Sequence, residues 1–300
     1  MLDLSGIFPA LTTPFAADGS VSPEDMKHNI RLYNKTAMDG YVVLGSTGEA
    51  VLLQAKEMDA ILAAVKETAA PGRKLIAGTG AESTAETIER TNRAAALGYD
   101  AALVKTPYYY KPAYSSEVLI AHYRRVADKS PIPILLYSVP IFTGLPLEPP
   151  EIIALSKHPN IIGIKDSSGD VQRISETIAE VSSKFLVLVG NAQTVYPSLA
   201  IGAAGAILAL ACAVPEKCAE LYRLFKDKKY SEARELQVVL LRAAKSFFSE
   251  MGIAGIKFVM DQRGYRGGNP RLPLQPLSAE QKSRLSAFVA TMEQSALAQA

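Results

Sequence analysis

Residues 161–178 read IIGIKDSSGDVQRISETI, a short apolar run followed by a polar turn and an amphipathic stretch. The apolar run has the composition of a buried strand, and Asp170 stands where a helix N-cap is expected. Val171, Ile174 and Ile178 then recur at helical spacing. This segment therefore predicts one strand–turn–helix unit.

The same alternation repeats along most of the chain. Eight apolar runs, separated by stretches with helical periodicity, cover residues 6–13, 41–45, 74–80, 101–106, 134–138, 161–165, 185–190 and 205–211. Apolar strands that alternate with helices are typical of an α/β protein with a parallel sheet, and eight units are what a (β/α)8 TIM barrel needs. A doubly wound open sheet is the alternative, which we disfavour because no Gly-x-Gly-x-x-Gly follows an early run.

The strand signals stop after about residue 213. Helical patterns then cover residues 215–226, 231–249 and 278–299. A loop rich in glycine, proline and arginine covers residues 263–276. We therefore expect a barrel domain with the active site at residues 1–227 and a C-terminal helical domain at residues 228–300.

Composition excludes several classes of protein. The 300 residues include 32 Lys+Arg and 30 Asp+Glu, so the net charge of +2 gives no reason to expect a nucleic acid or an anionic membrane as partner. The spacing of the two cysteines, Cys212 and Cys218, matches no common zinc site, and two cysteines cannot make a disulfide scaffold. We expect no metal. Without a visible secretory signal or a membrane-length apolar stretch, we expect a cytoplasmic protein.

The active site of such a barrel forms where strands end and loops begin, so a lysine at a strand end is informative. Lys165 closes the apolar run at residues 161–165. Burial lowers the pKa of a lysine amine and makes the amine a nucleophile towards carbonyls, as a Schiff-base enzyme requires. A structural ion pair between Lys165 and either Asp166 or Glu49 is the alternative.

Other strand ends add hydroxyl groups. The second run leads into Gly45-Ser46-Thr47-Gly48-Glu49, whose backbone N–H groups and hydroxyls suit a carboxylate or phosphate. Tyr137 ends the fifth run, and Tyr109 belongs to a tyrosine cluster at residues 107–112. A plain capped turn and structural packing of the tyrosines are the alternatives. Together with Lys165, these groups suit a 2-oxo acid: an amine nucleophile, a phenol that shuttles protons, and donors for the carboxylate.

At these residues the sequence resembles the dihydrodipicolinate synthase / N-acetylneuraminate lyase family of Schiff-base aldolases. The matching segments are residues 45–49, 107–112, 137–140 and 163–169, and the resemblance covers nearly the whole chain. It implies a barrel with a C-terminal helical domain, assembled as a homotetramer. It also implies an imine between Lys165 and pyruvate or a related 2-oxo acid, without a metal or an organic cofactor.

The resemblance further implies roles for individual residues. The implied catalytic residues are Lys165 as nucleophile, Tyr137 as proton shuttle, Ser46 as proton relay and Tyr109, which family members lend to a neighbouring subunit. The implied substrate-binding residues are Thr47, Ser167, Gly190 and Ile207. Ser46 would also help Thr47 to hold the substrate carboxylate.

One departure from the family pattern concerns the second substrate, an aldehyde. Dihydrodipicolinate synthases usually carry an arginine where this chain has Phe142, and phenylalanine cannot make a bidentate contact to a carboxylate. The segments at residues 137–140 and 165–171 look closest to 4-hydroxy-2-oxoglutarate aldolases, so we expect cleavage of 4-hydroxy-2-oxoglutarate to pyruvate and glyoxylate. Condensation of pyruvate with aspartate semialdehyde is the alternative, in which Lys111 or an arginine of the C-terminal loop would replace the missing contact.

Two further function classes stay open at this point. A non-catalytic 2-oxo acid binding protein would keep the pocket without turnover. A phosphate-sugar isomerase on the same fold would form no covalent adduct with its substrate.

Overall fold

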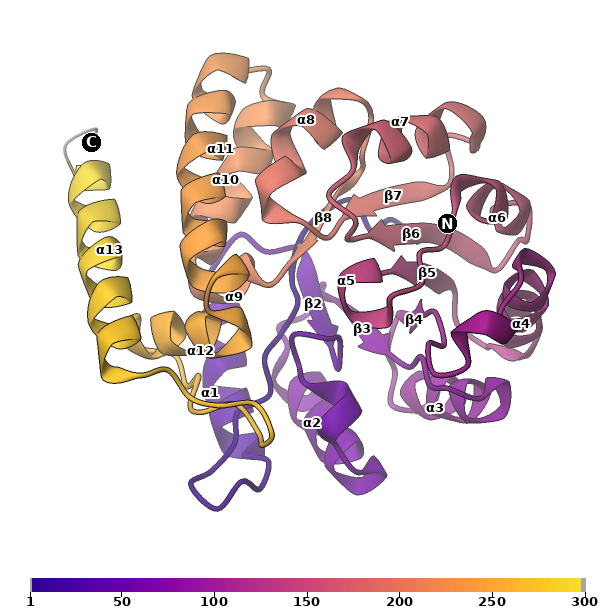
Figure 1. The fold of residues 1–300 in the computed structure, drawn as a ribbon, viewed down its shortest axis with the longest axis horizontal. Coiled ribbons are helices and arrows are strands. Elements are labelled where there is room, and N and C mark those ends of the chain that lie inside the picture. The colour runs from indigo at the N-terminus through magenta and orange to yellow at the C-terminus, as the bar shows by residue number, and fades with distance from the viewer. Residues whose placement is uncertain (1, 298–300) are drawn as a thin grey trace.

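The computed structural model describes residues 2–297, and its centre is a barrel of eight parallel strands (Figure 1). The strands are β1 (Gly6–Pro9), β2 (Gly40–Val43), β3 (Lys74–Gly78), β4 (Ala101–Lys105), β5 (Ile134–Ser138), β6 (Ile161–Asp166), β7 (Leu186–Val189) and β8 (Gly205–Leu208). Their order is β1-β8-β7-β6-β5-β4-β3-β2, and the Leu11 amide donates to the Val42 carbonyl at 2.8 Å beside the β1–β2 gap. The predicted TIM barrel is confirmed, and the open doubly wound sheet is wrong.

Helices cover the outside of the barrel. The longer ones are α1 (Pro23–Tyr33), α2 (Ala55–Thr68), α3 (Thr84–Ala96), α4 (Ser116–Lys129), α6 (Pro149–Leu155), α7 (Val171–Glu180), α8 (Val195–Ala200) and α10 (Pro215–Lys226). Short turns of helix stand in the loops: η1 (Ala50–Leu52), η2 (Lys111–Ala113), α5 (Pro140–Thr143), η3 (Ala192–Thr194) and α9 (Leu210–Ala213). As predicted, Asp170 caps α7, because its carboxylate accepts a hydrogen bond from the Arg173 amide at 3.1 Å.

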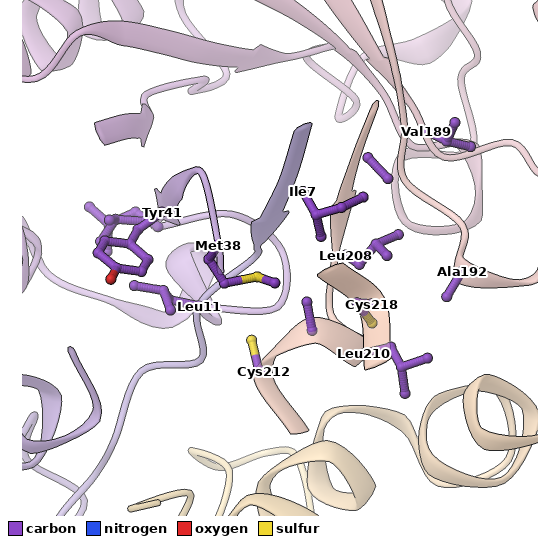
Figure 2. Packing of buried hydrophobic residues seen from close by; sticks show 14 of the residues in the cluster. Ile7, Leu11, Met38, Tyr41, Val189, Ala192, Leu208, Leu210, Cys212 and Cys218 are labelled. Carbon is purple, nitrogen blue, oxygen red and sulfur yellow. The ribbon is translucent and has the colours of Figure 1, made fainter. Parts of the chain in front are cut away.

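Two layers of apolar packing hold the barrel together. Phe8, Leu135 and Leu188 belong to a fully buried cluster inside the barrel. A larger cluster lies between the strands and the surrounding helices, and Figure 2 shows the part of it around Ile7 and Cys212. Burial of apolar surface is the main favourable term in folding. Because each strand faces one cluster on either side, its side chains are mainly apolar on both faces.

The chain continues past the barrel into further helices. These are α11 (Tyr230–Ala244), a π-helical turn η4 (Lys245–Ser249), α12 (Gly252–Gln262) and α13 (Ala279–Leu297), which Figure 1 shows beside the barrel. The proposed domain boundary at residues 227/228 falls between α10 and α11. Residues 298 and 299 of the last predicted helix, and residue 300 of the proposed domain, lie outside the described residues. Within residues 2–297, no helix is long and apolar enough to cross a bilayer.

Sequence reasoning did not predict helix α12. It packs against α9 and α13 and brings Met251, Ile253 and Ala254 to the open end of the barrel. Its sequence, GIAGIKFVMDQ, is apolar on most sides, so helical periodicity is weak there.

Candidate active site

A cavity of about 520 Å³ opens at the carboxyl ends of the strands. Its walls come from the loops after β2, β5, β6, β7 and β8, and from residues 244–254 and 270–275 of the C-terminal part of the chain. This is the end of a TIM barrel at which catalytic residues collect. The cavity therefore joins the barrel and the C-terminal helices in one site.

Lys165 lies at the inner end of the cavity. Its side chain is only 3% exposed, although the residue lines the cavity. β5 and β6 pair in parallel register, which sets Lys165 directly beside Tyr137, and the amine Nζ lies 4.3 Å from the centre of the Tyr137 ring. The strand register thus produces the predicted pairing of an amine with a phenol.

The two carboxylates considered as structural partners of Lys165 are engaged elsewhere. Glu49 forms an ion pair of 2.6 Å with Lys257, and Asp166 forms one of 3.2 Å with Arg173. Among the described residues, no salt bridge involves Lys165. The ion-pair interpretation of Lys165 is therefore wrong, and its amine faces the cavity.

The hydroxyl of Tyr137 lies close to the turn after β2. Its oxygen lies 3.4 Å from the Ser46 Oγ, and both Ser46 and Thr47 line the cavity. Thr13 donates a hydrogen bond of 2.6 Å to the Gly48 carbonyl of the same turn. The phenol and the hydroxyl thus lie together beside the Lys165 amine, an arrangement that suits proton transfer.

A buried ion pair fixes this turn from behind. Glu49, in the left-handed region at φ 55°, pairs with Lys257 of α12, and both side chains are fully buried. The Arg271 amide also donates to Glu49 at 2.7 Å, and Lys257 donates to the Asn269 carbonyl at 3.0 Å. Burial lowers the pKa of Lys257, while Glu49 opposes that shift by favouring the charged amine. The C-terminal helices thus position the turn that holds Ser46 and Thr47.

A second network fixes the turn after Lys165. The Asp166 carboxylate accepts hydrogen bonds from the Ser168 amide at 2.8 Å and the Ser168 hydroxyl at 2.5 Å. Arg173 contacts Asp166 from the other side, and it also binds Glu148 and the Leu147 carbonyl. Charge-assisted hydrogen bonds of this kind hold the backbone on both sides of Ser167.

Gly190 allows the inner wall to close around Lys165. A Cβ atom at Gly190 would lie 1.8 Å from the Ser167 Oγ and 3.1 Å from the Lys165 Cε. A side chain at this position would have to displace Ser167, so the close packing here favours glycine. Both Gly190 and Ser167 line the cavity, as does Thr47.

Two of the predicted residues lie outside the cavity walls. Ile207 of β8 is fully buried in the cluster inside the barrel, where Tyr137 is also a member. Tyr109 is 74% exposed and packs edge-on against Tyr110, with ring centres 5.0 Å apart. Neither side chain lines the cavity of the single chain.

Sequence reasoning missed the residues that support the site, namely Lys257, Arg173 and Arg271. Lys257 had a usable signal, since it is a lysine inside the apolar stretch GIAGIKFVM, just as Lys165 is a lysine at the end of an apolar strand. The two arginines carry no such signal, because their partners Asp166, Glu148 and Glu57 are distributed over different loops and helices.

This arrangement suits carbonyl chemistry. An amine in a mostly buried cavity can attack a carbonyl carbon, a neighbouring phenol and hydroxyl can carry the protons, and a turn of small polar residues can hold a carboxylate.

Comparison with known proteins identifies the family of the chain. The model of the dihydrodipicolinate synthetase family matches residues 3–292. A 4-hydroxy-tetrahydrodipicolinate synthase of Methanothrix thermoacetophila is 37% identical over 93% of this chain and 94% of its own length. The crystal structure of a dihydrodipicolinate synthase from Acinetobacter baumannii, complexed with pyruvate, has a TM-score of 0.92 and 31% identity over 97% of this chain and 99% of that chain. A prophage protein of the same family from E. coli K12, also in complex with pyruvate, gives a TM-score of 0.91 at 29% identity, over 97% of this chain and 99% of that chain. From the family match along nearly its whole length and the agreement in fold, the chain belongs to the dihydrodipicolinate synthetase family.

Proposed function

We propose that the protein is a carbon–carbon lyase that binds pyruvate, or a related 2-oxo acid, as an imine on Lys165. The observation that carries the proposal is the cavity-facing amine of Lys165, which has no carboxylate partner among the described residues and lies 4.3 Å from the Tyr137 ring. An amine that faces a cavity beside a phenol is placed to attack a carbonyl carbon.

The proposed chemistry follows from the positions of these groups. The neutral Lys165 amine attacks the 2-oxo carbon and forms a carbinolamine, which loses water to give a protonated imine. When the bond between the third and fourth carbons of the 2-oxo acid breaks, the imine accepts the electron pair and becomes an enamine. In the reverse direction, the enamine provides the electron pair for the new carbon–carbon bond. Tyr137 and Ser46 carry protons to and from the reacting oxygen atoms, while Thr47 and the turn around it hold the carboxylate.

The structures of relatives in complex with pyruvate support this choice of first substrate. For the second substrate, two reactions are candidates. The names of the relatives favour the synthase reaction, in which pyruvate condenses with aspartate semialdehyde. Phe142 speaks against the synthase reaction, because it stands where the synthases usually have a carboxylate-binding arginine. The resemblance of residues 137–140 and 165–171 to 4-hydroxy-2-oxoglutarate aldolases supports the second candidate, cleavage of 4-hydroxy-2-oxoglutarate to pyruvate and glyoxylate.

Replacement of the nucleophile tests the proposal. In Lys165→Ala we expect turnover of both candidate substrates to fall by about 10⁴-fold or more, as when a nucleophile is removed from other enzymes that form covalent intermediates. The measurement is steady-state kinetics, and an unchanged circular dichroism spectrum and Tm show that the variant is folded. Retained turnover would exclude the imine mechanism, and binding of pyruvate without turnover by the native protein would favour a non-catalytic binding protein.

A further inference from the structure

The outer part of the cavity differs in composition from the inner end. Its walls include six large apolar side chains, Ile141, Phe142, Phe248, Met251, Ile253 and Leu274. They come from α5, the π-helical turn η4, the start of α12 and the C-terminal loop. Ile141 and Phe142 are 77% and 52% exposed, so their side chains are open to an incoming molecule.

The walls carry little charge. Among the residues whose side chains the structure describes, Lys165 is the one charged residue that lines the cavity. In the proposed reaction the nitrogen of Lys165 carries its positive charge as a protonated imine, which lies beside the carboxylate of pyruvate. The cavity therefore offers a second carboxylate no separate cation from this chain.

Neither Lys111 nor Arg271, two of the cations that the sequence offers in place of the missing arginine, lines the cavity. The Lys111 side chain lies against Gly144, where an added Cβ would be 2.9 Å from the Lys111 Cε. The guanidinium of Arg271 binds Glu57 at 2.7 Å and the Gly19 carbonyl at 2.6 Å. Tyr109, which the family resemblance gives to a neighbouring subunit's site, would add a phenol and no charge.

Part of the polar surface in the outer cavity is already paired. The Gln193 side-chain amide donates to the Ser249 hydroxyl at 2.9 Å and so connects η3 to the π-helical turn. A carboxylate bound here would lose its hydration and gain no cation as a partner, which costs free energy. An apolar group bound here gains free energy because its surface leaves water.

We propose that the outer cavity binds an acceptor aldehyde whose substituent is uncharged and apolar. The proposal rests on the imine at Lys165 and departs from the two candidate second substrates named above, because glyoxylate and aspartate semialdehyde each carry a carboxylate. In the condensation direction, the methyl carbon of the pyruvate enamine attacks the aldehyde carbon, a new carbon–carbon bond forms, and the aldehyde oxygen takes a proton from Tyr137. Water then hydrolyses the imine and releases a 4-hydroxy-2-oxo acid, while the aldehyde substituent packs against Phe142, Phe248 and Ile253.

Two aldehydes of equal size test the proposal. Succinic semialdehyde ends in a carboxylate, and 4-methylpentanal carries an isopropyl group of the same shape in its place. With pyruvate as donor, we expect kcat/KM for 4-methylpentanal to exceed that for succinic semialdehyde by about tenfold or more, the ratio expected for an unpaired carboxylate at an apolar site. The condensation products are measured by mass spectrometry.

A positive charge introduced at the rim of the cavity should shift the preference towards the aldehyde that carries a carboxylate. Phe142→Arg is expected to raise kcat/KM for succinic semialdehyde by about tenfold, because a guanidinium binds a carboxylate with two charge-assisted hydrogen bonds. Leu272→Arg adds the same charge at a position that is 70% exposed and outside the cavity walls, and we expect it to leave the preference unchanged.

Exchange of the pyruvate methyl protons with D₂O, followed by NMR, needs the imine but no aldehyde. If the native protein exchanges these protons and prefers succinic semialdehyde, or condenses neither aldehyde, the proposed acceptor class is wrong and the imine stands. If Phe142→Arg leaves the preference between the two aldehydes unchanged, the proposed acceptor class is also wrong and the imine still stands. If no exchange occurs, the proposed function itself fails.

Discussion

The inner end and the outer rim of the cavity are built in different ways. Lys165 and Tyr137 at the inner end are nearly fully buried and lie on adjacent strands, whereas Ile141 and Phe142 at the rim are exposed and lie in a four-residue helix. Buried ion pairs hold the turns around the inner end, whereas Ile141 and Phe142 at the rim carry no charge that could form one. In the proposed reaction, the first chemical step therefore depends on positions fixed by the whole fold, while the choice of acceptor depends on a few replaceable side chains.

The largest effect on stability is expected from Lys257→Met. This change leaves the Glu49 carboxylate fully buried without its cation, and loss of one partner of a buried pair costs about 3–5 kcal/mol. Urea unfolding measures the free energy of unfolding. Because Glu49 ends the turn that holds Ser46 and Thr47, we also expect KM for pyruvate to rise in protein that remains folded.

Two variants separate this role from a general loss of packing. Glu49→Gln combined with Lys257→Met removes both charges, so it should recover a large part of the lost stability. Lys229→Met changes an exposed lysine at the start of α11 and should alter stability by less than about 0.5 kcal/mol. A Lys257→Met variant as stable as Lys229→Met would show that the buried pair does not support the turn.

A smaller and more local effect is expected from Gly190→Ala. The added Cβ would collide with the Ser167 Oγ at 1.8 Å and crowd the Lys165 Cε at 3.1 Å. Displacement of the reacting amine by about 1 Å can cost about 10²-fold in rate, so we expect kcat to fall by that order. Steady-state kinetics measures it, and Leu272→Arg, which lies outside the cavity walls, should keep the native kcat.

Removal of the colliding side chain provides the control. Ser167→Gly eliminates both the Oγ and the Cβ that face position 190, so the double variant with Gly190→Ala should recover part of the lost rate relative to Ser167→Gly alone. Equal losses in the presence and absence of the Ser167 side chain would contradict a steric cause.

The comparison also explains what could be predicted from the sequence. Each of the eight predicted strands exists, because a strand buried on both faces leaves a continuous apolar run. Residues 205–211 were predicted as one strand, but β8 ends at Leu208 and α9 begins at Leu210, since apolar strands and short buried helices have the same composition. Lys165, Tyr137 and Ser46 were found because strand ends meet at one end of a barrel.

The supporting contacts could not be predicted in the same way. Glu49 pairs with Lys257 in α12, and a single sequence holds no record of contacts between such distant segments. By charge alone, Glu49 is an equally good partner for Lys165. In the structure, however, Glu49 pairs with Lys257. The sequence indicates the composition of the rim only in part. Phe142 departs from the family pattern, whereas the contributions of Phe248, Met251 and Ile253 depend on how the C-terminal helices pack.

The most direct test of the central claim is the mass of the intact protein after reaction with pyruvate and borohydride, followed by mapping of the modified peptide. The account predicts one stable pyruvyl adduct per chain, located on Lys165, with no label on Lys105, the lysine at the end of β4 that pairs with Glu82 at 3.3 Å. An unmodified mass in folded protein, beside a control aldolase that reacts normally, would contradict the account.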